Sequence, residues 1–275
     1  MGRSIREGRY GVSLGLHIYQ PKRGGDHELM RGISTDPLGA DWNGIAIEQC
    51  YSKLAAGGGL QNFDLYGTLR TEIARRDPET SRLMHEAMQV NGIGDSFLHN
   101  ILPHMDNEDK KTLIEAGKAQ YIRDVGKSPT VFWGAESAYD MATLEILADN
   151  GYEAFICAPE QIIQVDGEAS DNRPTHIMLS KGRSIMALPF DRPVSSALGW
   201  DTEGRKNADR FVETYIIPAL DRNEARKARR GDNMPNVMIA YTDGETFGLH
   251  DKFGHLFVIY LGKEALEKRD IDPVS

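Results

Sequence analysis

Short apolar runs alternate along the chain with longer stretches of helical periodicity. Strand-like runs, bounded by Gly, Pro or polar clusters, cover residues 11–19, 129–136, 152–159, 183–190 and 236–244, and two more flank a polar turn within residues 162–180. Helical patterns cover residues 44–56, 67–76, 77–90, 107–126 and 140–150, a stretch of five or six turns starting near Thr202, and residues 251–269. This alternation predicts an α/β fold in which helices cover a parallel sheet.

The number of strands bears on the kind of α/β fold. About seven strands in one chain of 275 residues favour a barrel or distorted barrel over an open sheet, although the pattern alone does not separate the two. The sequence contains no internal repeat and no low-complexity segment. We therefore expect a single domain over residues 1–275.

Composition narrows the class of protein. The net charge of −9 argues against general nucleic-acid binding, which needs a positive surface. No apolar run approaches 18 residues and the first residues lack the apolar core of a signal peptide, so we expect a cytoplasmic protein without membrane contact. Cys50 and Cys157 lie in apolar contexts typical of buried thiols. No glycine-rich phosphate-binding motif follows a strand, so no nucleotide cofactor is expected.

Residues able to do chemistry gather where the strands end. Each has an ordinary structural reading: a histidine beside a strand is often a core residue, and a glutamate before a helix often caps it. Their recurrence at strand exits is informative, because in a barrel those exits converge on one pocket. Paired carboxylates from different strands suit glycoside hydrolysis, but the same residue types could bind a divalent metal, and spacing does not decide. The residues at these exits are His17, Gln20, His99, Trp133, Glu136, Asp243 and Glu245.

Several of these segments, taken in order, resemble glycoside hydrolase family 57. They are HIYQP (17–21), LHNILP (98–103), WGAESAYDMATLEILADNGYEAFICAPEQ (133–161) and YTDGETFGLHDKFG (241–254), with DWNGIAIEQCY (41–51) similar to an early region. The first motif, with Tyr in place of a second His, is closest to an uncharacterised branch of that family. The likeness spans roughly residues 11 to 260.

The resemblance implies a fold, an activity and residue roles. The family's fold is an incomplete (β/α)7 barrel, and its activities are mostly retaining chemistry on α-glucans: amylase, branching and glucanotransfer. By this resemblance Glu136 would be the nucleophile and Asp243 the general acid/base, with no metal and no cofactor required. A carbohydrate would be the partner, bound by residues near these motifs: His17, Gln20, Trp42, His99, Trp133, Glu245 and His250.

The sequence also departs from the family's pattern. Family members usually continue well past 400 residues into a helical region that helps close the cleft, and we expect this chain to lack that extension. Two alternatives therefore stay open. One is a metal-dependent hydrolase of the polysaccharide deacetylase kind, using Asp243, His17 and His99, although its usual tandem Asp motif is absent. The other is a carbohydrate-binding domain that has kept the fold without turnover.

Overall fold

The structure is a computed structural model that describes residues 10–21, 41–162, 172–231 and 236–274. Its strands are β1 (Tyr10–Ile18), β2 (Asn62–Leu65), β3 (Val131–Phe132), β4 (Ala154–Cys157), β5 (Thr175–Met178), β6 (Ser184–Pro189), β7 (Val237–Asp243) and β8 (Ile271–Pro273). Its helices are α2 (Trp42–Ala46), α3 (Ser52–Gly57), α4 (Gly67–Arg76), α5 (Pro78–Asn91), α6 (Asn107–Val125), α7 (Met141–Asp149), α8 (Arg192–Trp200), α9 (Ala208–Phe211), α10 (Ile217–Arg230) and α11 (Gly254–Tyr260).

These strands form two sheets. The first has the order β2-β1-β7, with β8 also paired to β1, and the second has the order β3-β4-β6-β5. Every strand pair is parallel except β5 with β6. The two sheets meet at single parallel bridges, Phe63 with Gly92 and Gly94 with Phe132. On the other side Asp191 N donates to Ile239 O at 2.7 Å. The α/β class is thus confirmed, but the hydrogen bonds of the described strands do not close into a barrel.

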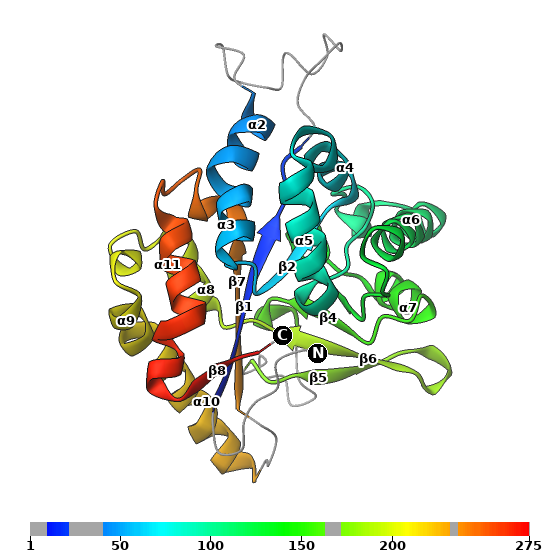
Figure 1. Cartoon of the computed structure of the whole chain (residues 1–275). Helices are drawn as coiled ribbons and strands as arrows, with labels where there is room; N and C mark the ends of the chain where they lie inside the picture. The colour runs from blue at the N-terminus through cyan, green and yellow to red at the C-terminus, as the bar shows by residue number, and fades with distance from the viewer. Residues whose placement is uncertain (1–9, 22–40, 163–171, 232–235, 275) are drawn as a thin grey trace.

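Helices cover the first sheet and bury its apolar face. Figure 1 shows α3, α5 and α11 packed in front of β1 and β7, with α6 and α7 beside the second sheet. The largest core cluster joins residues of β1, β2 and β7 to residues of these covering helices, and Val12, Ile18 and Phe63 within it are fully buried. β2 is buried at all four residues, so it shows none of the alternation that marks a half-exposed strand.

Helix ends follow local sequence signals, with one correction. Asp77 and Asp140 accept hydrogen bonds from the first turns of α5 and α7, as their positions predict. The long helix expected near Thr202 begins only at Ala208, because the Asn207 side chain caps it by accepting from Arg210 N at 3.0 Å. The residues before it form a turn and a short 3-10 helix, Gly204–Lys206.

Helix α8 is a feature that the sequence pattern did not reveal. It begins after the Asp191 cap and lies along β7, where Tyr241 N donates to the Ser195 hydroxyl at 3.0 Å. A Cβ placed on Gly199 would lie 3.0 Å from the Thr242 hydroxyl. The carboxyl end of α8 therefore reaches the carboxyl end of β7. Of the two strand-like runs expected in residues 162–180, the second is β5 and the first lies largely outside the described residues.

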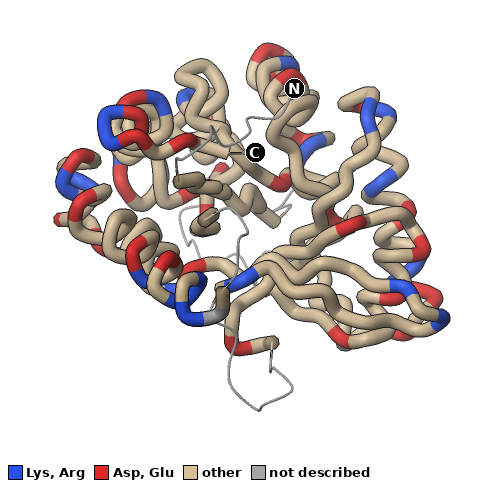
Figure 2. Tube along the Cα trace, turned by 90° about the horizontal axis from the view of Figure 1, so that it is seen from below, with Lys and Arg blue, Asp and Glu red and all other residues tan. Residues whose placement is uncertain are grey.

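The surface carries both signs of charge. In Figure 2 acidic and basic residues are interspersed around the periphery of the molecule. No helix in the described part of the chain is long and apolar enough to cross a membrane. Cys50 and Cys157 are free and buried, as their apolar contexts predict.

Candidate active site

A row of three polar residues crosses the exits of the first sheet. His17, one residue before the end of β1, is the register partner of Asp64 on β2 and of Asp243 at the end of β7. Side chains at the same level of neighbouring parallel strands point to the same face. The fold therefore places a histidine between two acidic residues that are distant in sequence.

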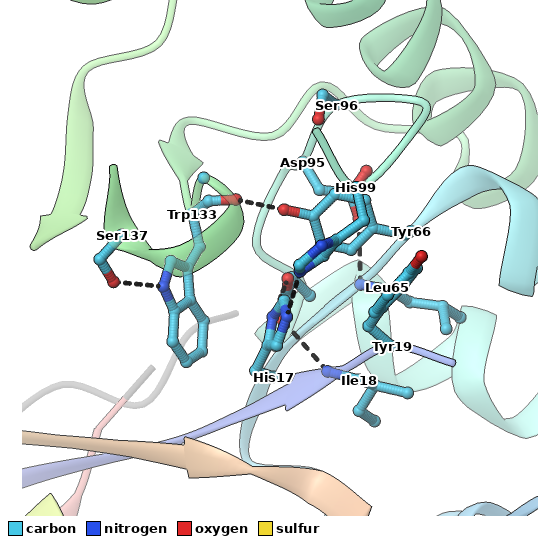
Figure 3. Close-up of polar contacts among 12 residues, drawn as sticks. His17, Ile18, Tyr19, Leu65, Tyr66, Asp95, Ser96, His99, Trp133 and Ser137 are labelled. Carbon is cyan, nitrogen blue, oxygen red and sulfur yellow. Dashed lines mark hydrogen bonds and ion pairs between the residues drawn. The ribbon is translucent and has the colours of Figure 1, made fainter. Parts of the chain in front are cut away.

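Aromatic rings surround this histidine. The His17 ring lies 5.0 Å from both the His99 and Trp133 rings and 5.5 Å from the Tyr66 ring, between centroids. Tyr19 stacks on His99 at 3.9 Å with an interplanar angle of 10°. Figure 3 shows the two histidines adjacent to each other, with Tyr19 on one side and Trp133 on the other. Three of the expected site residues, His17, His99 and Trp133, are thus brought together.

Hydrogen bonds and charge make the two histidines unequal. His17 Nδ1 lies 2.7 Å from Asp64 Oδ2, and His17 Nε2 lies 2.9 Å from His99 Nε2. Burial by itself lowers the pKa of His17, but the charge and hydrogen bond of Asp64, with the charges of Glu245 and Asp243, raise it to about 9. Burial and the neighbouring His17 lower the pKa of His99 to about 4.

Glu245 is buried below this cluster and is held by protein groups. Its Oε1 accepts hydrogen bonds from the Tyr51 hydroxyl and from Tyr19 N, the latter at 3.2 Å. Burial raises the pKa of Glu245 to about 7, although the Tyr51 hydrogen bond opposes the rise. Both contacts fasten the exit of β1 to its surroundings, so Glu245 fits a supporting role.

Glu136 lies in a left-handed turn directly after β3. Its φ is 55° and that of Ser137 is 50°, a conformation that costs a residue with a Cβ about 1–2 kcal/mol. The turn is held by its neighbours: Ser137 N donates to Gly134 O at 2.9 Å, Trp133 Nε1 to the Ser137 hydroxyl at 3.0 Å, and Gly134 N to the Tyr139 hydroxyl at 2.7 Å. Strain that the surroundings enforce is typical of functional sites.

The two expected catalytic carboxylates share an exposed, unpaired state. Glu136 and Asp243 are both exposed, and within the described ranges neither side chain makes a hydrogen bond or an ion pair. They extend from the exits of β3 and β7, which belong to different sheets. The carboxylates of Glu136 and Asp243 are therefore available to a ligand.

Comparison with known proteins assigns the chain to a family. Residues 27–274 match the family model described as Glycosyl hydrolase family 57. The chain belongs to glycosyl hydrolase family 57. This confirms the resemblance seen in the motifs. No curated protein sequence matches the chain.

Solved structures of family 57 enzymes share the fold. The 4-α-glucanotransferase from Thermococcus litoralis matches with a TM-score of 0.72 at 16% identity, over 96% of this chain and 39% of that one. The branching enzyme from Pyrococcus horikoshii matches with a TM-score of 0.73 at 15% identity, over 97% and 68%. The α-amylase AmyC from Thermotoga maritima gives 0.68 at 15%, over 97% and 73%. At these identities the likeness shows the fold alone, and this chain spans 39 to 73% of those three chains.

Three other residues expected in the family 57 site come from different parts of the fold. Gln20 is half-buried just past β1, and Trp42 is half-buried at the start of α2. His250 is exposed and lines a hollow of about 760 Å³ between α9 and α11, together with Phe253.

Some residues of the site escaped sequence reasoning. Asp64 and Tyr66 sit in NFDLYG (62–67), and the Asp within this apolar run was the available signal, because a buried carboxylate needs a partner. Tyr51 lies in the early region but carried no sign of its contact with Glu245. Outside this cluster, Trp200 is 85% exposed at the end of α8, a helix that the sequence pattern did not predict.

The described side chains do not favour a metal centre. Among them no group of three His, Cys, Asp or Glu side chains is placed to hold a metal ion. His17, a ligand in the metal-dependent alternative, already uses both ring nitrogens on Asp64 and His99. Neither nitrogen is left for a metal in this arrangement.

Proposed function

We propose that this chain is the catalytic part of a retaining glycoside hydrolase or transglycosylase that acts on an α-glucan. The observation that carries the proposal is Glu136, which is exposed, unpaired and strained at a strand exit in a chain of family 57. The surrounding turn maintains a conformation that Glu disfavours, and a nucleophile needs such a fixed presentation. Asp243 would be the acid/base.

The proposed chemistry is a double displacement. Asp243 protonates the glycosidic oxygen while the Glu136 carboxylate attacks the anomeric carbon, which gives a covalent glycosyl-enzyme. Asp243 then takes a proton from the incoming water, in hydrolysis, or from a sugar hydroxyl, in transfer. Retention requires the two carboxyl groups to lie about 5–5.5 Å apart, whereas inversion needs roughly 6.5–9.5 Å. We expect the shorter separation in a crystal structure, and carboxyls more than about 10 Å apart would refute the pair.

We also infer that the two sheets are parts of one incomplete (β/α)7 barrel in a single domain. The bridges at Gly92 and Gly94 join β2 to β3, and the hydrogen bond from Asp191 N to Ile239 O joins the exit of β6 to β7. This arrangement supports strand exits that converge on one cleft.

Exposed aromatic surface supports a sugar ligand. Trp200 is 85% exposed and follows Gly199, which packs against Thr242 next to Asp243. An indole left in water at the rim of a site suits stacking on the apolar face of a pyranose ring. Trp133 is buried, with its indole nitrogen bonded to Ser137, so it supports His17 instead of forming an open platform.

The test separates the two carboxylates by role. With a glycosyl fluoride, which needs little protonation to leave, Asp243→Ala should still form the covalent intermediate, and azide should rescue its turnover to a glycosyl azide of retained configuration. Glu136→Ala should form no covalent intermediate and should give an azide of inverted configuration. Swapped outcomes would reverse the two roles.

A matched control is available at the exit of β4. Glu160 is also an exposed glutamate in a short turn after a strand, but it is paired with Arg192 at 2.7 Å. Glu160→Ala should leave turnover on a panel of α-glucans unchanged. If neither Glu136→Ala nor Asp243→Ala lowers turnover by more than about tenfold, roughly 1.4 kcal/mol, the pair is not the catalytic apparatus.

A further inference from the structure

His17 connects a buried carboxylate to a second histidine. Its Nδ1 faces Asp64 Oδ2 at 2.7 Å and its Nε2 faces His99 Nε2 at 2.9 Å. Asp64 is fully buried, and its other oxygen accepts a hydrogen bond from Ile18 N at 3.3 Å. The His17 side chain is only 14% exposed, so this alignment is fixed by protein groups on both sides, as Figure 3 shows for the histidines.

The geometry limits where the protons can be. An ionised carboxylate only accepts, so His17 Nδ1 must carry a proton. Two facing Nε2 atoms at 2.9 Å share one proton, so one ring donates and the other accepts. If His17 is neutral, His99 must donate to it. If His17 is an imidazolium, it donates to His99, which is then neutral with its own proton on Nδ1.

The charges around the pair favour the second arrangement. Three acidic residues act on the charge of His17: Asp64 on β2, Asp243 on β7 and Glu245 after β7. A fourth, Asp95 between α5 and α6, interacts with both Asp64 and His17. Arg70 offsets part of this negative charge, because its guanidinium lies 3.8 Å from Asp95 Oδ2. Asp64, Asp95 and Glu245 are buried, and burying neighbouring carboxylates is unfavourable unless a positive charge lies among them.

We propose that Asp64 is a positioning residue of this site: it holds His17 as an imidazolium that donates to His99, and so places a fixed cation beside Asp243 and Glu245 at the exit of β7. The pair of Asp64 and His17 is neutral overall, so it adds no net charge against the positive sugar of the transition state. The pKa of His17, raised to about 9, and that of His99, lowered to about 4, agree with this direction. The inference rests on the proposed function only for its kinetic consequence.

The test is side-chain nitrogen NMR on protein labelled with ¹⁵N-histidine, with His17 assigned from a His17→Gln variant. At pH 7.5 His17 should be doubly protonated, and His99 should be neutral with the proton on Nδ1. Asp64→Asn keeps an acceptor for Ile18 N but removes the carboxylate charge that stabilises protonated His17. Burial then opposes protonation of His17. The His17 pKa should fall from about 9 by at least ~2 units, a loss of about 100-fold or more in proton affinity.

Controls keep the result interpretable. Asp64→Glu retains the charge and should restore a protonated His17. Asp191→Asn removes an equally buried carboxylate, 1% exposed, at another strand exit and should leave His17 unchanged. If Asp64→Asn does not fold, His99→Gln serves instead: it removes the second imidazole, leaves an amide oxygen that can accept from His17, and keeps Asp64, so His17 should stay protonated at pH 7.5.

A neutral His17 in the unaltered protein at pH 7.5, or an unchanged titration in Asp64→Asn, would overturn the proposal. So would loss of the proton in His99→Gln. On an α-glucan substrate, Asp64→Asn should lower kcat and change the pH profile with little change in KM, and Asp64→Glu should recover part of the rate. If no glucan is turned over, the spectra still decide the role of Asp64, so failure of the proposed function is seen separately.

Discussion

Replacing Glu136 by glycine should stabilise the protein while abolishing its activity. Glu136 has φ 55° and ψ 19°, where a side chain with a Cβ is strained by about 1–2 kcal/mol. Glycine relieves this strain, but its greater conformational freedom in the unfolded chain lowers the free energy of unfolding by about 0.5–1 kcal/mol. Because Glu136 is exposed and unpaired, little packing is lost with its side chain. We expect a net gain of about 0.5–1 kcal/mol, or roughly 1–3 °C in Tm.

The assay compares three variants by urea unfolding and by turnover. Glu136→Ala keeps the strained φ, so it should match the parent in stability within about 0.5 kcal/mol, yet it should be as inactive as Glu136→Gly. Lys181 has nearly the same backbone, with φ 57° in an exposed turn, so Lys181→Gly should gain similar stability and keep full activity. Both Glu136 variants should lose at least about 10³-fold in kcat, about 4 kcal/mol of barrier.

Two results would refute this reasoning. If Glu136→Gly is no more stable than Glu136→Ala, the turn stores no strain at this residue, and the structural argument for a functional role is lost. If Glu136→Gly is stabilised but still turns over glucan at the parent rate, the strain is real and Glu136 is not the nucleophile.

Three further predictions follow from the site. Asp64→Asn should cost more stability at pH 7 than at pH 10 in urea unfolding. The raised pKa of His17 contributes stability that is present below pH 6.5 and is lost as the pH rises through about 9. Equal costs at the two pH values would contradict this. Trp200→Ala should raise KM for oligosaccharides about two- to tenfold, since an aromatic stacking contact is worth about 0.5–1.5 kcal/mol. Trp200→Phe should keep most of the affinity, and an unaltered KM in the alanine variant would show that Trp200 does not contact the sugar. Turnover should survive extensive dialysis against a chelator, because two carboxylates suffice for the double displacement; bound metal in stoichiometric amount, with activity lost on its removal, would favour the deacetylase-like alternative.

The sequence by itself determined much of the local structure and the position of the chemistry. Caps such as Asp77 and Asp140 fixed helix starts because the side chain bonds to backbone only three residues away. The WGAE and DGE segments placed Glu136 and Asp243 at strand exits, because an apolar run followed by polar residues marks the end of a buried strand. The order of the motifs indicated the family, which the family model confirms.

Only the tertiary structure decided what surrounds these residues. β2 was not predicted because it is buried on both faces and shows no alternation. Asp64 on β2 was therefore not predicted either, although it hydrogen-bonds to His17, 47 residues away in sequence. The charge of His17 depends on that distant carboxylate, so no local pattern around HIYQP could set it. The turn of Glu136, by contrast, is held within its own segment, where Gly134 N donates to the Tyr139 hydroxyl and the Trp133 indole donates to the Ser137 hydroxyl. Local signals report the backbone's own preferences, whereas the ionisation of His17 is set by groups that only folding brings into contact.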